Sequence, residues 1–524
     1  MAKPLKSWKN WFGNISISVK SFFPKQDSRQ NLTLQLAEWC TGHPWLVLLL
    51  WLLLTTGLFI GAILAKETFL PFQTNNSPGL SSRELAEGVV GTLSTAANFL
   101  IVIILLLTIL LTSFGTVVAA LLGLLMAVSS LLFTFGLLTL TLPPLGVKDV
   151  PGAIIIGLVG LGSSIDYTLF IVSRFRFKLH DCHDTAQALE LASATAGKAN
   201  FASAIIWTVT LSGLLLVRDT VLSTVALGTL FLIGISALGS VTVLPALLGL
   251  LGENINRGRL PYFGNDESEG SGLWGKVVIT AARLPRLFFL LASAVLVVLL
   301  FPVLQLHLSE KGNILINPPG PNSNYLAILL LIFAYVSILS LFVILFQVRS
   351  ILLAISSIIM SSLSSGAGLG IVVLVFQFGW FKQLLGLDAA PATIDRGLLV
   401  LFFPLFFGFS MSYQVLTLQR MAESRKRGSS TRVAVTNGVR VISGVVVSAG
   451  SVMRTAVTLL VAIQFSAFQQ LGLGLLAGIY LDAVLVRCIL IPAMLQLISR
   501  TRWDLPVVRD AIPGLDAEQV EVNG

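Results

Sequence analysis

Charged residues are scarce in this chain. Asp, Glu, Lys and Arg together make up 11% of its 524 residues, whereas about a quarter of the residues of a soluble globular protein are charged. This scarcity excludes the ordinary soluble classes. Apolar residues are abundant instead, at 55% of the chain with a mean hydropathy of +0.89. The composition predicts an all-α polytopic membrane protein.

Cysteine and histidine are also rare, with three and four residues. The cysteines, Cys40, Cys182 and Cys488, fall on or near the predicted cytoplasmic side, so no disulfide is implied. The histidines lack the spacing of metal ligands, and the sequence contains no nucleotide-binding loop, catalytic triad or metal motif. We therefore expect neither an enzyme nor an ATP-driven pump, and no metal or other cofactor.

Apolar runs long enough to cross a bilayer as a helix recur about twelve times. They cover residues 45–65, 96–113, 116–142, 152–174, 199–217, 221–251, 287–306, 324–347, 351–379, 397–418, 441–463 and 466–497. The connections between them, including 66–95 and 307–323, are too short to form independent domains. The chain is thus predicted to consist of a membrane core.

The basic residues predict its orientation. Most of the 34 Lys and Arg residues fall in alternate loops, which places those loops and both termini in the cytoplasm. Residues 1–44 are basic and aromatic and are expected at the membrane surface, and residues 498–524 form a cytoplasmic tail. The net charge of +9 then reflects topology and attraction to anionic lipids, not nucleic acid. We expect a multi-pass protein of a bacterial plasma (inner) or internal membrane.

The two halves of the chain are similar. A shift of 246 residues superposes Asp166 on Ser412, Tyr167 on Tyr413 and Arg174 on Arg420. This predicts two six-helix repeats, 45–251 and 287–497, joined by a flexible cytoplasmic linker, 252–286. Because each repeat contains an even number of spans, both have the same orientation in the membrane.

Several stretches carry a family resemblance. DYTLFIVSRFR in the fourth run, SMSYQVLTLQRM in the tenth, LLGLDAAPATID before it and LDAVLVRCILIPA in the twelfth resemble the MmpL branch of the RND transporter superfamily, whose members export lipids and siderophores. The resemblance implies the RND membrane core, but without the large extracytoplasmic porter domains that family members carry. It also implies contact with lipids or another hydrophobic molecule, and a partner protein that supplies the missing part or a larger membrane complex.

Asp166 is the first candidate functional residue. A carboxylate within a span costs about 2.5–3.5 kcal/mol and normally faces the bundle interior with a partner or a function. The resemblance implies that Asp166 carries a proton, with Tyr167 or Tyr413 as its hydrogen-bond partner. A structural polar contact is the alternative. Family members pair this Asp-Tyr with a second one, and here Ser412 replaces its acid.

Two further sets of charges lie within predicted spans. Arg454 in the eleventh run is expected to face inward and pair with Asp166, which would either switch with protonation or keep Asp166 ionised. Asp482 and Arg487 in the twelfth run are five residues apart, about 140° around an α-helix. We therefore expect each of them to bind a neighbouring helix instead of the other.

Two functions fit these patterns. The first is a transporter core that moves a lipid or other hydrophobic molecule, with proton coupling through Asp166. The second is a degenerate, non-pumping homologue that serves as a scaffold, assembly factor or subunit of a membrane complex. The lost acid at Ser412 and an Asp166–Arg454 bridge would favour the second.

Overall fold

The computed structural model describes residues 32–64, 107–141, 150–182, 184–217, 220–259, 273–309, 325–348, 350–383, 393–426 and 466–499. Within these residues every named element is a helix, and the β-structure consists of two isolated bridges. Ten helical segments are long and apolar enough to span a membrane. The predicted all-α polytopic fold is confirmed.

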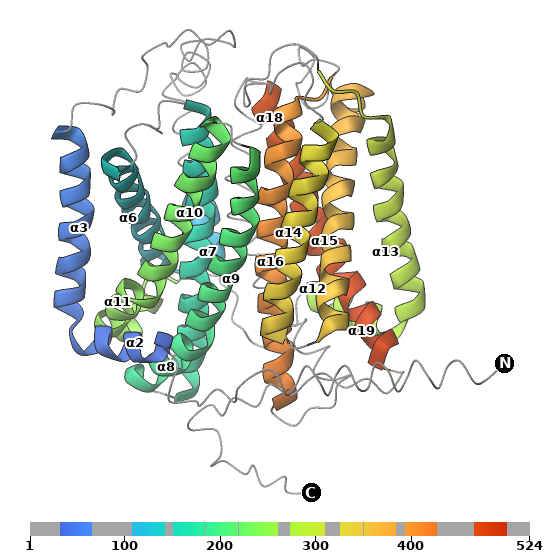
Figure 1. Cartoon of the computed structure of the whole chain (residues 1–524). Coiled ribbons are helices and arrows are strands. Elements are labelled where there is room, and N and C mark those ends of the chain that lie inside the picture. Colours follow the sequence, from blue (N-terminus) through green and yellow to red (C-terminus); the bar gives the residue numbers. More distant parts are fainter. Residues whose placement is uncertain are drawn as a thin grey trace, which may run out of the picture.

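The described helices form two bundles that stand side by side (Figure 1). The N-terminal bundle contains α2 (Leu32–Gly42), α3 (Pro44–Leu64), α6 (Val117–Thr141), α7 (Val150–Cys182), α8 (Thr185–Ala192), η3 (Ser193–Gly197), α9 (Lys198–Ser212), η4 (Gly213–Val217), α10 (Thr220–Val241), α11 (Val243–Leu251) and η5 (Gly252–Asn256). The C-terminal bundle contains α12 (Leu273–Arg283), α13 (Pro285–Leu300), η6 (Phe301–Gln305), α14 (Tyr325–Val348), α15 (Ile351–Val372), η7 (Val373–Gln377), α16 (Arg396–Lys426), α18 (Ser466–Leu481), η8 (Asp482–Leu490) and α19 (Ile491–Ser499).

The ten spans coincide with ten of the twelve apolar runs. The second run, 96–113, lies mostly outside the described residues, and the eleventh, 441–463, lies wholly outside them. Helices are expected here because a bilayer offers no water to the backbone, so each segment must satisfy its own N–H and C=O groups. The apolar composition therefore sets both the class and the length of the elements.

Burial separates central helices from peripheral ones. The spans in α16 and α7 are 94% and 78% buried, whereas those of α3 and α13 are 17% and 11% buried. Exposed leucines and valines on α3 and α13 fit contact with lipid chains. The two helices that carry Asp166 and Ser412 are thus among the most protected elements of the protein.

The bundles meet where α9 packs along α16. A Cβ atom on Gly408 would lie 2.6 Å from Thr210 Oγ1 and 2.6 Å from the Trp207 ring of α9. Only a glycine permits this approach, and small residues serve the same purpose at other membrane helix contacts. Gly408 therefore sets the distance between α16 and the N-terminal bundle.

The segment 252–286, predicted as a flexible linker, lies outside the described residues at 260–272 and is helical on either side of them. It contains η5 and the amphipathic helix α12, whose Val278 and Ala281 are fully buried. α12 packs against η8 and α19 of the C-terminal bundle. The sequence LWGKVVITAAR forms this helix because its apolar residues lie on one face. The polar residues beside it make this short apolar face hard to recognise in the sequence.

Candidate functional site

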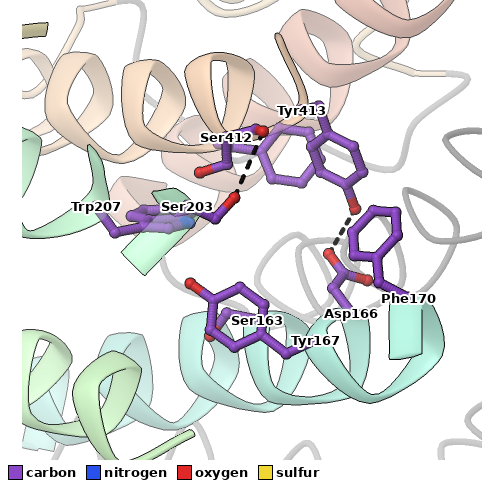
Figure 2. Close-up of a pocket in the computed structure, with 9 residues that line it drawn as sticks. Ser163, Asp166, Tyr167, Phe170, Ser203, Trp207, Ser412 and Tyr413 are labelled. Atoms are coloured by element: carbon purple, nitrogen blue, oxygen red, sulfur yellow. Dashed lines mark hydrogen bonds between the residues drawn. The ribbon is translucent and has the colours of Figure 1, made fainter. Parts of the chain in front are cut away.

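Asp166 lies near the middle of α7 and points toward α16 (Figure 2). Its side chain is only 5% exposed. Tyr413 of α16, itself 3% exposed, donates its hydroxyl proton to Asp166 Oδ2 over 2.6 Å. Of the two tyrosines expected as partners, Tyr413 makes this bond. The contact joins a helix of the N-terminal bundle to a helix of the C-terminal bundle.

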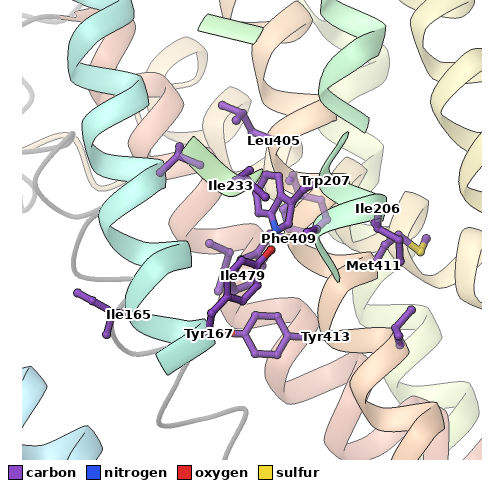
Figure 3. Close-up of a cluster of buried hydrophobic side chains, with 14 of the residues drawn as sticks. Ile165, Tyr167, Ile206, Trp207, Ile233, Leu405, Phe409, Met411, Tyr413 and Ile479 are labelled. Carbon is purple, nitrogen blue, oxygen red and sulfur yellow. The ribbon is translucent and has the colours of Figure 1, made fainter. Parts of the chain in front are cut away.

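Apolar side chains from α7, α9, α10, α16 and α18 surround this contact (Figure 3). The Tyr413 ring lies against Phe409, with 4.7 Å between ring centroids, and edge-on to Phe170 at 5.8 Å. These aromatic contacts fix the ring and exclude bulk water. In such surroundings a charge-assisted hydrogen bond is stronger than in water.

Ser412 and Tyr167 also line a small cavity beside Asp166. The Ser412 hydroxyl donates to the Gly408 carbonyl of its own helix over 2.6 Å. It therefore does not form a bond between the bundles as Asp166 does. The Tyr167 hydroxyl makes no hydrogen bond with any residue that the structure describes. The Asp166-Tyr167 and Ser412-Tyr413 motifs therefore lie at one site, but only Asp166 and Tyr413 bond to each other.

Asp482 and Arg487 each bind a neighbouring helix, as predicted, but they also contact each other, which the prediction had excluded. Arg487 Nε donates to Asp482 Oδ2 over 2.7 Å, and both side chains are almost fully buried. The reason is that η8 is a π-helix, in which hydrogen bonds run from i to i+5. Residues five apart then lie close to one face, whereas in an α-helix they diverge by about 140°.

Serine hydroxyls complete this second site. Ser410 Oγ donates to Asp482 Oδ1 over 2.8 Å, Ser364 Oγ donates to the same atom over 3.4 Å, and Arg487 Nη2 donates to the Ser410 carbonyl over 2.6 Å. Sequence reasoning missed Ser410, although it lies two positions before Ser412 in the same polar stretch. The polar residues within this apolar run could have indicated Ser410 as a site residue.

Tyr413 connects the two sites. Its hydroxyl group bonds Asp166, and the Arg487 guanidinium carbon lies 5.3 Å from its ring centroid, within the range of a cation–π contact. The order of groups is thus Asp166, Tyr413, Arg487 and Asp482. The predicted partner Arg454 lies outside the described residues, so its pairing with Asp166 stays a prediction.

Comparison with known families identifies the chain. The model of the MMPL family matches residues 84–288 and 324–513, more than half of the sequence. The chain belongs to the MMPL family. The two matched blocks contain all the site residues discussed above, so the buried carboxylate and the second charged pair lie within the part of the chain that the family model matches.

Curated relatives of this MMPL protein are distant in sequence. The mycolic acid-containing lipids exporter MmpL11 of Mycolicibacterium smegmatis is 24% identical over 83% of this chain and 59% of the relative. The trehalose monomycolate exporter MmpL3 of Mycobacterium tuberculosis is 24% identical over 67% of this chain and 52% of the relative, and the heme uptake protein MmpL11 of the same species is 23% identical over 77% and 53%. The chain thus spans between half and three-fifths of the length of these relatives.

A solved structure shares the fold. The crystal structure of SecDF in its super-membrane-facing form matches 80% of this chain and 63% of its own, with a TM-score of 0.57 and 14% identity. At this identity the likeness concerns the fold alone. The match indicates that the two proteins share the arrangement of their helices.

Proposed function

We propose that this MMPL protein moves a lipid or another hydrophobic molecule in a bacterial plasma membrane and couples the movement to a proton carried by Asp166. The observation that carries the proposal is the Tyr413–Asp166 hydrogen bond, which joins the two bundles through a buried carboxylate. The names of the relatives, which describe export of mycolic acid-containing lipids or trehalose monomycolate, or uptake of heme, support the hydrophobic substrate.

The mechanism follows from the chemistry of this bond. An ionised carboxylate accepts a charge-assisted hydrogen bond, which is about twice as strong as a neutral one. Protonation of Asp166 removes that advantage and weakens the link between α7 and α16. Transporters built from repeats alternate access by moving one half against the other. A proton on Asp166 would therefore weaken one of the contacts that join the two bundles.

The Asp482–Arg487 pair plays a supporting part in this scheme. Its two charges neutralise each other, and the serines around it occupy the remaining acceptor positions of the carboxylate. Arg487 places its positive charge against the face of the Tyr413 ring. The pair thus contacts the ring whose hydroxyl donates to Asp166.

Ser412 supports a second candidate function, that of a non-pumping scaffold, assembly factor or subunit. Its hydroxyl bonds to its own helix, so the repeat that carries it contributes no acid at this site. Under either function we propose that both termini are cytoplasmic. We also propose that a partner protein supplies material outside the membrane, because the connections 66–95 and 307–323 are too short to form domains.

Proton flux into proteoliposomes distinguishes the two functions. The full chain is reconstituted in phosphatidylethanolamine and phosphatidylglycerol with a pH-sensitive dye inside, and a pH step is applied. We expect flux in the wild type and its loss in Asp166→Asn. Asp184→Asn is the matched control, because Asp184 caps α8 outside the spans and Asn caps a helix equally well. Equal flux in wild type and Asp166→Asn would exclude Asp166 as the proton carrier.

A further inference from the structure

Three large aromatic side chains are exposed at one end of the C-terminal bundle. Phe378, Trp380 and Phe381 follow directly after η7 and are 44%, 57% and 65% exposed. α13 leads from α12 to η6, and η6 packs against α15 and η7. The aromatic turn, residues 378–382, therefore lies at the end of this bundle that is distant from α12.

The backbone of the aromatic turn has an unusual conformation. Gly379 has a φ of 75°, and Phe381 has a φ of 60°, the one positive φ of a non-glycine residue in the part of the chain that the structure describes. A bulky residue rarely adopts this left-handed conformation, and strained backbone of this kind is concentrated at functional sites. The strain thus falls on the most exposed of the three aromatic residues.

The matching connection of the first repeat has a different composition. Residues 142–149, LPPLGVKD, join the third and fourth spans and contain no aromatic residue. The architecture of the repeat therefore does not by itself require an aromatic turn. This difference indicates a role that belongs to the C-terminal bundle.

The surface beside the aromatic turn indicates lipid as its partner. The turn continues the apolar surface of α13 and η6, on which Val298, Phe301 and Leu304 are exposed. The span that contains α13 and η6 is the least buried of the ten, which fits contact with lipid chains. A surface continuous with it meets the same bilayer, and Trp is enriched where a bilayer meets water.

The hydrogen bonds of the backbone fit the same environment. The N–H groups of Phe378, Trp380 and Lys382 donate to carbonyl groups of η7 or of the turn itself, over 3.0–3.4 Å. Beside the turn, the Gln377 side chain donates to the Gln305 carbonyl over 2.6 Å. A bilayer offers no water to the backbone, so a chain that leaves its helix beside lipid has to satisfy these groups within the protein.

We propose that the aromatic turn inserts into the interfacial layer of the bilayer and anchors this end of the C-terminal bundle to lipid. Trp380 and Phe381 lie between the headgroups and the upper acyl chains, and the bend at Gly379 directs them there. The turn thereby fixes the depth of α15 in the membrane. This contact is independent of transport and of the proton on Asp166.

Quenching of tryptophan fluorescence tests the anchor. The full chain is placed in phosphatidylcholine nanodiscs, with or without bromine on the upper acyl chains, and the emission of Trp380→Phe is subtracted from that of the wild type. The difference is the emission of Trp380, and bromine quenches it only on contact. Trp380→Phe keeps an aromatic ring at an exposed position, so the fold is retained. Trp207→Phe is the matched control, because Trp207 is buried within the protein and its signal should not respond to bromine.

We expect the brominated lipid to remove most of the Trp380 signal and iodide added to the water to remove little of it. Quenching by iodide and not by brominated lipid would place the turn in water. Quenching by neither would mean that a second copy of the chain or a partner protein covers the turn. Either of these results would overturn the proposal.

Discussion

Tyr413 on α16 donates a 2.6 Å hydrogen bond to Asp166 on α7, so one phenol joins the two bundles at a carboxylate shielded from water. The same ring carries the Arg487 guanidinium group on its face. Any change in the charge of Asp166 therefore acts on a side chain that belongs to the other bundle. This relationship leads to the predictions below.

Tyr413→Phe removes the hydroxyl but keeps the ring that packs against Phe170, Phe409 and Arg487. A hydrogen bond to a charged group contributes about 1.5–3 kcal/mol, and 1.4 kcal/mol corresponds to a factor of ten. We expect proton flux in proteoliposomes to fall about tenfold or more. Tyr480→Phe, at a site that is 50% exposed, should leave flux unchanged. Unaltered flux in Tyr413→Phe would show that the bond has no part in coupling.

The Asp482–Arg487 pair should respond as a unit. Removal of one member of a buried pair costs about 3–5 kcal/mol because the other charge is left uncompensated. Asp482→Asn and Arg487→Gln should each lower thermal stability in detergent, whereas the double variant, which buries no charge, should recover much of the loss. A double-mutant cycle measures the coupling. Strictly additive losses would mean that the two side chains do not depend on each other.

Gly408 is the position at which a single methyl group should separate the bundles. The Cβ atom of Gly408→Ala would lie 2.6 Å from Thr210 and Trp207, and overpacking of this kind costs about 1–3 kcal/mol. We expect a lower melting temperature and reduced flux. Gly57→Ala on α3 is the control, since a Cβ atom there meets no atom within 4 Å. A Gly408→Ala variant as stable as the control would show that α16 and α9 adapt to the added group.

The number of coupled protons should be one. The twelve predicted spans contain two acids, Asp166 and Asp482, and Asp482 is neutralised by Arg487. The dependence of flux on proton concentration should therefore fit a single protonation, with a Hill coefficient near one. A steeper dependence in the wild type, lost in Asp482→Asn, would show that the second acid also titrates.

Much of the fold could be predicted because a bilayer permits few solutions. Apolar runs of sufficient length must be helices, and ten of the twelve runs are described as such. The family resemblance also implied Tyr167 or Tyr413 as the partner of Asp166, and Tyr413 makes the bond. Motif spacing could identify these residues because the hydrogen bond joins the two matched motifs, from Asp166 of the first repeat to Tyr413 of the second.

The second charged pair could not be predicted in the same way. Its geometry depends on a π-helix, which brings residues five apart together, and composition does not distinguish a π-helix from an α-helix. α12 was missed because its apolar stripe is short and interrupted by charges. Ser410 was missed because its role depends on Asp482, which lies on another helix.

Lipid movement driven by a proton gradient tests the central claim most directly. Proteoliposomes carry fluorescent NBD-phosphatidylethanolamine, and dithionite added outside quenches the lipid that has reached the outer leaflet. With a pH gradient imposed, we expect faster quenching in the wild type than without the gradient, and no such acceleration in Asp166→Asn. If the gradient accelerates quenching equally in both proteins, or in neither, proton-coupled lipid movement through Asp166 is contradicted.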